Sequence, residues 1–242
     1  MLRENRGFTL IELVMIIVII GVLATVATRK MGSTIETARV EQTKKELAQL
    51  SFAIVGNPDL YTDGARTDFG YVGDVGALPP SLTALTTNPG GYSTWDGPYI
   101  VGDFKNDGYR KDAWSTDYVY SDTVLRSTGS GSNIDKVFAA STPALLSNSV
   151  SGYVVDAGND VPGTDFIDSL WISLIYPNGT GGTTTSSAHP DANGSFSFSA
   201  IPIGNHALRL VYIPDSDTVT LAVSVTPNNT TKLSITFPAD LW

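Results

Sequence analysis

The first feature of the chain is an apolar run near its amino terminus. Residues 13–27 read LVMIIVIIGVLATVA, and with residues 8–12 they give a 20-residue stretch that is about 30 Å long as a helix. That length is enough to cross the hydrocarbon core of a bilayer. No proline follows until the stop signal Gly56-Asn57-Pro58. The pattern therefore predicts one helix over residues 8–55, with residues 8–28 in the membrane.

The second half of this helix has a different pattern. Apolar positions recur there at spacings of three and four, at Val40, Thr43, Leu47, Leu50 and Ile54. Such spacing places one mostly apolar stripe along a helix face. The stripe predicts that this half of the helix packs on a globular region.

Residues 56–140 are rich in Gly, Asp, Tyr and Trp and show no sustained helical period. We expect loops and a small sheet there, with aromatic side chains packed over the helix stripe, because aromatic residues bury large areas. The Ser/Thr-rich residues 141–149 are interpreted as a linker.

From residue 150 to residue 242 the apolar period changes to two. Leu170, Ile172 and Leu174 form one alternating series, and similar series follow in residues 207–212, 219–225 and 233–237. Turn signals separate these runs, and about seven short strands in some 90 residues are typical of a β-sandwich. The sequence thus predicts an α+β chain: a long helix, a small β-sheet and loop region, and an antiparallel β-sandwich.

Composition and charge exclude several classes of function. The chain has no Cys, which excludes disulfides, thiolate metal sites and a cysteine nucleophile. Its net charge of −9 and its lack of a long basic run argue against nucleic-acid binding. Residues 141–242 hold 8 Asp against 2 basic residues, whereas residues 8–55 have a net charge of +1.

Glu12 is the one acidic residue of the apolar segment. An ordinary secretory signal peptide, cleaved to give a chain that starts at Thr28, is one interpretation of the segment. A carboxylate near the edge of a membrane segment is costly, however, and marks a functional site. On composition alone the two interpretations remain open.

Residues 6–13, Arg-Gly-Phe-Thr-Leu-Ile-Glu-Leu, resemble the amino-terminal signal of type IV pilins and of type II secretion pseudopilins. The resemblance implies a leader over residues 1–7, which a prepilin peptidase removes by cutting after Gly7 and then methylating the new terminus, Phe8. It also implies a role in assembly for Glu12. Its carboxylate would pair with the amino group of Phe8 in a neighbouring subunit, so that the helices of residues 8–28 form the core of a homo-oligomeric filament.

Residues 56–140 resemble the globular region of the major pseudopilin in residues 78–85 and 95–99, and more loosely in residues 112–120. Ala113, Ser115 and Asp117 stand where that family usually has Pro, Gly and Pro. The resemblance implies an inner-membrane assembly platform and minor pseudopilins as partners. It also makes calcium a candidate ligand, since this region is rich in oxygen donors, although no EF-hand spacing assigns them. The Asp residues available are Asp103, Asp107, Asp112, Asp117, Asp122 and Asp135.

Residues 150–156, 191–198 and 201–204 resemble carboxypeptidase regulatory-like sandwich domains, which are usually non-catalytic modules of surface proteins. No nucleophile motif accompanies His189 or His206, and both are expected at solvated turn and strand-start positions. The sequence therefore predicts that the chain is not an enzyme.

Taken together, we expect a single-pass precursor in the cytoplasmic membrane that assembles into a periplasmic or extracellular filament. The favoured interpretation is a pseudopilin of a type II secretion system. A type IV pilus subunit with an adhesive surface domain is the first alternative. The second is a membrane-anchored or secreted binding protein with an ordinary signal peptide.

Overall fold

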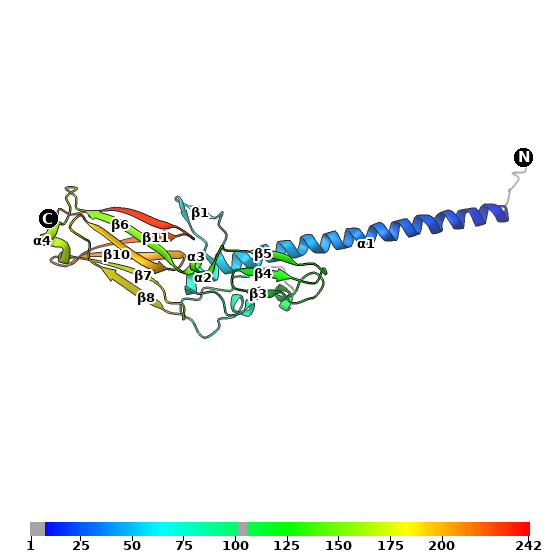
Figure 1. The fold of residues 1–242 in the computed structure, drawn as a ribbon, viewed down its shortest axis with the longest axis horizontal. Coiled ribbons are helices and arrows are strands. Elements are labelled where there is room, and N and C mark those ends of the chain that lie inside the picture. Colours follow the sequence, from blue (N-terminus) through cyan, green and yellow to red (C-terminus); the bar gives the residue numbers. More distant parts are fainter. Residues whose placement is uncertain (1–7, 101–105) are drawn as a thin grey trace, which may run out of the picture.

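The computed structural model describes residues 8–100 and 106–242 of the chain. One long helix projects from a β-rich body, and the carboxyl terminus lies at the opposite end of the molecule (Figure 1). The body has two regions in series, a mixed region beside the helix and a β-sandwich beyond it (Figure 1). The predicted α+β fold class is confirmed.

Helix α1 runs from Leu10 to Val55, and both of its ends have clear physical causes. Thr9 is the N-cap, with its side chain accepting a hydrogen bond from the backbone N–H of Glu12. At the other end Gly56 has a φ of 77°, and a Cβ there would overlap the carbonyl of Asp68. The buried guanidinium of Arg66 then donates to the Val55 carbonyl at 2.6 Å, which places a cation at the negative end of the helix dipole.

The predicted stripe of α1 is confirmed. Thr43, Leu47, Leu50 and Ile54 are all buried, and Val40 is partly buried. Between Leu10 and Ala38 every residue whose exposure is described is exposed. The helix is therefore one continuous element with two different surroundings.

The mixed region surrounds the second half of α1 with short elements. Its helical parts are α2 (Gly70–Val75), the 3-10 turns η1 (Leu82–Leu85) and η2 (Asn106–Arg110), and α3 (Thr142–Leu146). Its strands are the hairpin β1 (Tyr61–Thr62) and β2 (Ala65–Arg66), and the antiparallel sheet β3 (Val119–Ser121), β4 (Val124–Ser127) and β5 (Ile134–Val137). The expected small sheet and loops are thus present.

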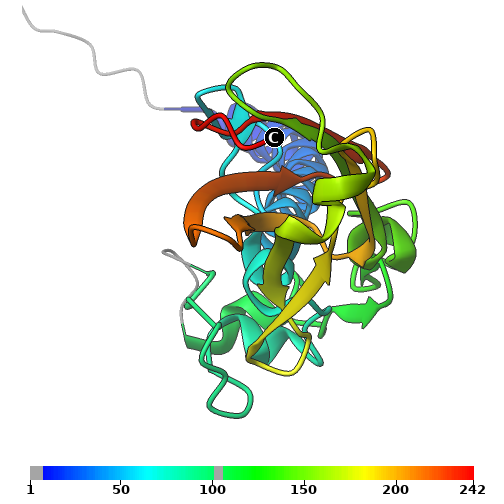
Figure 2. The same ribbon diagram turned by 90° about the vertical axis from the view of Figure 1, so that its left-hand side faces the viewer.

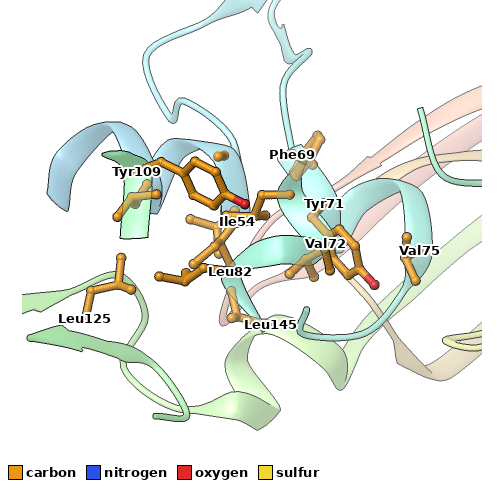
Figure 3. Close-up of a cluster of buried hydrophobic side chains, with 14 of the residues drawn as sticks. Ile54, Phe69, Tyr71, Val72, Val75, Leu82, Tyr109, Leu125 and Leu145 are labelled. Carbon is orange, nitrogen blue, oxygen red and sulfur yellow. The ribbon is translucent and has the colours of Figure 1, made fainter. Parts of the chain in front are cut away.

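The core of this region forms between α1 and its short neighbours. Figure 3 shows Ile54 of α1 among side chains from α2, η1, η2, β4 and α3. Leu50, Ile54, Val72, Leu85 and Leu125 are fully buried. Because no disulfide is present, this packing is what holds the short elements on the helix.

The outer region is built from seven strands in two sheets, in the order β11-β10-β7-β8 and β12-β6-β9. The strands are β6 (Asn148–Val155), β7 (Leu170–Pro177), β8 (Thr183–Ala188), β9 (Ser195–Ile201), β10 (Gly204–Tyr212), β11 (Asp217–Val225) and β12 (Thr230–Thr236). A short helix α4 (Gly163–Phe166) and a 3-10 turn η3 (Ile167–Ser169) lie between β6 and β7. Leu170, Ile172 and Leu174 face the core, as their alternation predicts.

One strand pair differs from the antiparallel sandwich that we expected. Strand β12 pairs with β6 in parallel, from Thr230 opposite Ser149 to Thr236 opposite Val155. The cause is the connection from β11, which lies in the other sheet, so that the chain changes sheets before it forms β12. Alternation reveals which face of a strand is buried, but not the direction of its neighbour.

The linker predicted over residues 141–149 is wrong, because this segment forms α3 and the start of β6. Ser141 caps α3 by accepting a hydrogen bond from the Ala144 N–H at 3.3 Å. Leu145 and Asn148 are buried, and Leu145 belongs to the core of the mixed region. Serine and threonine act here as caps and strand residues, which composition alone does not distinguish from a linker.

The two regions of the body share backbone hydrogen bonds. The N–H of Gly179 donates to the Val75 carbonyl and the N–H of Ile203 donates to the Leu145 carbonyl, both at 2.8 Å. Gly204 has a φ of 150°, and a Cβ on it would lie 3.0 Å from the Gly73 carbonyl oxygen, so the close approach of β10 to α2 requires glycine. Viewed from the sandwich end, α1 lies behind the sandwich (Figure 2).

Candidate functional site: the exposed half of helix α1

The exposed half of α1 has a long run of large apolar side chains that are open to solvent. Their exposed fractions range from 43% at Ile16 to 82% at Leu10. α1 is long and apolar enough to cross a membrane. Soluble monomers rarely expose so large a continuous apolar surface, because its contact with water is unfavourable. Lipid or other protein chains are therefore expected to cover it.

Glu12 lies in the first turn of α1 and forms a capping box with Thr9. Its carboxylate accepts hydrogen bonds from the backbone N–H and the hydroxyl of Thr9, both at 2.8 Å. The apolar surroundings of Glu12 suggest an unpaired carboxylate. In the single chain, however, Thr9 provides it with two hydrogen-bond donors. No described cation bonds to it.

Of the predicted processing and assembly residues, Gly7 lies outside the described residues. Phe8 is described and is 77% exposed, directly before the N-cap Thr9. The roles given to Gly7, Phe8 and Glu12 remain predictions. The sequence reasoning missed the capping role of Thr9, although the Thr-X-X-Glu spacing of a capping box is visible in Thr9-Leu10-Ile11-Glu12.

The globular body first contacts α1 well beyond its apolar run. The indole N–H of Trp114 donates to the Glu36 carboxylate at 3.0 Å, and the backbone N–H of Ala113 donates to the Thr43 hydroxyl at 3.3 Å. One helical turn further, the Tyr118 hydroxyl donates to the Glu46 carboxylate at 2.7 Å. Burial raises the pKa of Tyr118, and this hydrogen bond to a carboxylate raises it further.

The segment that carries Trp114 is organised by the buried carboxylate of Asp112. That carboxylate accepts hydrogen bonds from the Ser127 hydroxyl at 2.6 Å and from the backbone N–H groups of Trp114, Thr116 and Gly129 at 2.9 to 3.0 Å. Burial alone would raise the pKa of Asp112, but these hydrogen bonds outweigh burial and hold the pKa below its ordinary value.

The Asp residues considered for calcium do not come together in the described part of the chain. Asp112 uses its carboxylate to bind its own loops, and Asp135 pairs with Arg126. Asp103 and the side chain of Asp107 lie outside the description. Within residues 8–100 and 106–242, no group of three His, Asp or Glu residues is placed to hold a metal ion.

The two histidines do not form a catalytic pair with any described nucleophile. His189 is partly buried, and its Nδ1 lies 2.8 Å from the Leu170 carbonyl oxygen. His206 was expected at a solvated strand start, but that expectation is wrong: it is only 3% exposed, because the start of β10 lies against α2. Burial lowers the pKa of His206, and a hydrogen bond to the Pro202 carbonyl opposes this in part.

Comparison with known families adds one decisive observation for the exposed half of α1. Residues 2–28 match the family described as the prokaryotic N-terminal methylation motif. This segment is prepilin-like. The match covers the predicted cleavage point after Gly7, the predicted methylation site Phe8, Glu12 and the whole apolar run, and it supports a type IV pilin-like subunit with a membrane-anchored precursor. No curated protein matches the chain.

Similar solved structures are distant. A dioxygenase domain from Streptomyces sp. SirexAA-E is 13% identical and covers 40% of this chain and 82% of its own, with a TM-score of 0.30. The Streptococcal ancillary pilin is 12% identical and covers 49% of this chain and 43% of its own, with a TM-score of 0.28. The major pilin subunit of Bacillus cereus is 16% identical and covers 52% and 42%, with a TM-score of 0.27. At these values the likenesses assign no function.

Proposed function

We propose that this chain is a structural subunit of a type IV pilus-like filament, and specifically a pseudopilin of a type II secretion system. The observation that carries the proposal is the methylation motif over residues 2–28, on a helix half whose apolar side chains have no cover within the described chain. In the precursor, lipid covers this surface. In the filament, the same surface of other subunits replaces the lipid, so apolar area stays away from water in both states.

Processing supplies a cationic partner, which the Glu12 carboxylate does not have among the described residues. Cleavage after Gly7 by a prepilin peptidase creates a positively charged amino group at Phe8. The hydrogen bonds from Thr9 keep the Glu12 carboxylate satisfied while the subunit is alone in the membrane. In the filament, the amino group of Phe8 from a neighbouring subunit forms a charge-assisted hydrogen bond with that carboxylate, which is stronger than a neutral one and sets the stagger between subunits.

The body of the subunit lies outside the helical core of the filament. The sandwich is at the end of the molecule opposite the exposed half of α1, so it decorates the filament surface (Figure 1). Its net charge of −6 over residues 141–242 keeps this surface soluble. An inner-membrane assembly platform and minor pseudopilins are the partners proposed for assembly. The role is structural and not enzymatic.

The secretion branch rests on the resemblance of residues 78–85 and 95–99 to the major pseudopilin. A type IV pilus subunit, with the sandwich as an adhesive surface module, is the second candidate, and the sandwich itself favours it. Deleting the gene separates the two: loss of export of folded proteins supports the secretion branch, whereas loss of surface attachment with normal export supports the pilus branch.

The experiment that tests the filament proposal is mass spectrometry of the mature amino terminus from the membrane fraction. We expect the mature chain to start at Phe8 and to carry one methyl group on its amino nitrogen. A mature chain that starts at Thr28 would instead identify an ordinary signal peptide and overturn the proposal. As a matched control, Gly7→Leu should block cleavage, because the peptidase cuts directly after this residue.

A further inference from the structure

Among the described hydrogen bonds from the body to α1, the one nearest the amino end of the helix comes from Trp114, in the loop of residues 112–118. Its indole donates to Glu36, whereas Ala113 contacts Thr43 and Tyr118 contacts Glu46 further along the helix. Between the N-cap Thr9 and Glu36, no described residue of the body is hydrogen-bonded to α1. Trp114 therefore marks the level at which the body begins.

The length of the helix places this level near the membrane surface. The apolar run ends at Ala27, and Glu36 lies about 13 Å further along the axis at 1.5 Å per residue. Side chains on a helix lean toward its amino end, so the Glu36 carboxylate lies closer to the bilayer than the Glu36 backbone, and the Trp114 indole bonds to that carboxylate. The headgroup layer on each side of the hydrocarbon core is about 5–8 Å thick. The Glu36 backbone thus lies about 5–8 Å beyond that layer, and the lean of the Glu36 side chain shortens this distance.

The charges around Trp114 favour this position. Glu36 bonds to both Arg39 at 3.1 Å and the indole of Trp114, and the carboxylate of Asp112 is buried within its own loop. The neighbouring turn of residues 128–133, between β4 and β5, has no charged residue. The Trp114 loop and the turn of residues 128–133 together form a rim beside α1. Lys30 lies between this rim and the apolar run, whereas the sandwich at the far end is strongly acidic. Residues 112–116 and 128–133 therefore present no exposed carboxylate to a phospholipid surface, whereas Asp117, which follows the first of these segments, is exposed.

The loop is also held in one conformation. Asp112 ties Trp114, Thr116 and Gly129 together, and Ser115 has a positive φ of 66°. A Cβ on Gly129 would lie 2.8 Å from the Cβ of Trp114, so the two loops approach as closely as glycine permits. Trp is enriched at membrane interfaces because its ring is apolar while its N–H remains polar.

We infer that in the membrane-inserted precursor the Trp114 loop, together with the turn of residues 128–133, rests on the phospholipid headgroup layer. The inference depends on the proposed function, since it requires α1 to span the bilayer. It gives this rim a role that the methylation motif does not contain: it fixes the height of the body above the membrane before assembly. In the filament, the same rim leaves the lipid.

The test uses the full-length precursor in phosphatidylcholine and phosphatidylglycerol vesicles that contain a headgroup-attached nitroxide lipid, which quenches nearby tryptophan fluorescence. Trp114→Phe should lower the quenched intensity, the fluorescence lost on adding the nitroxide lipid, at least threefold. The matched control Trp171→Phe removes an exposed tryptophan from the distal sandwich and should leave the quenched intensity unchanged. An unchanged quenched intensity in Trp114→Phe would overturn the inference.

A reporter within the apolar run separates failure of the inference from failure of the proposed function. Val18→Trp, made in the Trp114→Phe background, should be quenched by a nitroxide attached deep in the acyl chain. If this reporter is quenched and Trp114 is not, α1 spans the bilayer and only the headgroup contact is absent. If the reporter is not quenched, α1 does not span the bilayer, and the proposed function fails as well.

Discussion

The two halves of α1 are one continuous helix with opposite relations to their surroundings. From Leu10 to Ala38 the described side chains are exposed, whereas Leu47, Leu50 and Ile54 of the second half are buried against the body. Within the first half, residues 13–27 are apolar around the whole circumference, whereas the second half is apolar along one stripe only. A surface that is apolar on all sides requires cover from lipid or other subunits, while a stripe requires only the chain's own body. Assembly and stability should therefore be separable along this helix.

The largest expected effect tests the first half. Glu12→Ala should reduce filament yield at least tenfold, because the neighbouring Phe8 amino group then has no carboxylate to bind. Leader cleavage and the unfolding midpoint of the body should not change, since Glu12 contacts no part of the body. Filaments are counted by electron microscopy of sheared preparations, and cleavage is followed by mass spectrometry. Wild-type filament yield in this variant would contradict the proposed pairing.

The reciprocal change tests the second half. Leu50 is fully buried, so Leu50→Ala should lower the free energy of unfolding by about 2–5 kcal/mol, from lost burial and a residual cavity. Urea unfolding of the full-length precursor in detergent micelles measures this change. The matched control is Leu23→Ala in the exposed half, which should leave the unfolding of the body unchanged. Equal destabilisation by both variants would mean that the two halves are not independent.

A smaller effect concerns the end of the stripe. Arg66 donates to the carbonyls of Val55 and Asp68 from a buried position, at 2.6 and 2.8 Å. Arg66→Gln should lower the free energy of unfolding by about 1.5–3 kcal/mol, because these charge-assisted bonds are lost and the last carbonyl of α1 is left without its donor. Arg126→Gln removes an exposed ion pair with Asp135 and serves as the control, with no measurable change expected.

The smallest expected effect is the pH dependence of stability that comes from the Asp112 carboxylate. The pKa of Asp112 is lowered in the folded chain, so its stabilising contribution is complete above the unfolded value of about 4 and is lost as the pH falls through the folded pKa. Acidification from pH 7 to pH 3 should therefore lower the free energy of unfolding more in the wild-type chain than in the Asp112→Asn variant. Asp215→Asn, in the exposed turn between β10 and β11, should keep the native response in urea unfolding. If Asp112→Asn lost as much stability on acidification as the wild-type chain, the Asp112 carboxylate would not be the source of this pH dependence.

Much of the fold could be predicted because its signals are local. The apolar run, the stripe from Thr43 to Ile54 and the alternation in β7 and β10 each depend on neighbours a few positions apart, and all three correspond to structure. The capping box of Thr9 and Glu12 was equally local, and it could have been predicted from the spacing of the two residues.

The remaining features depend on contacts between distant segments. The bond from Trp114 to Glu36 joins residues 78 positions apart, and the burial of His206 arises where β10 approaches α2. Neither leaves a periodic trace in the sequence. The linker prediction for the Ser/Thr-rich segment that forms α3 and starts β6 was wrong for a related reason. Leu145 is buried because it packs in the core of the mixed region, which the composition of its own segment does not reveal.

The parallel pair of β6 and β12 has a mechanical consequence. β6 is the strand through which the chain enters the sandwich, β12 is the last strand before the carboxyl end, and seven residue pairs align between them. Because the two strands run in the same direction, tension between the membrane-anchored helix and an object held at the carboxyl end pulls them lengthwise past each other. The hydrogen bonds of the pair then bear the load together instead of opening one at a time. The parallel pair of β6 and β12 therefore resists stretching of the sandwich between its first and last strands.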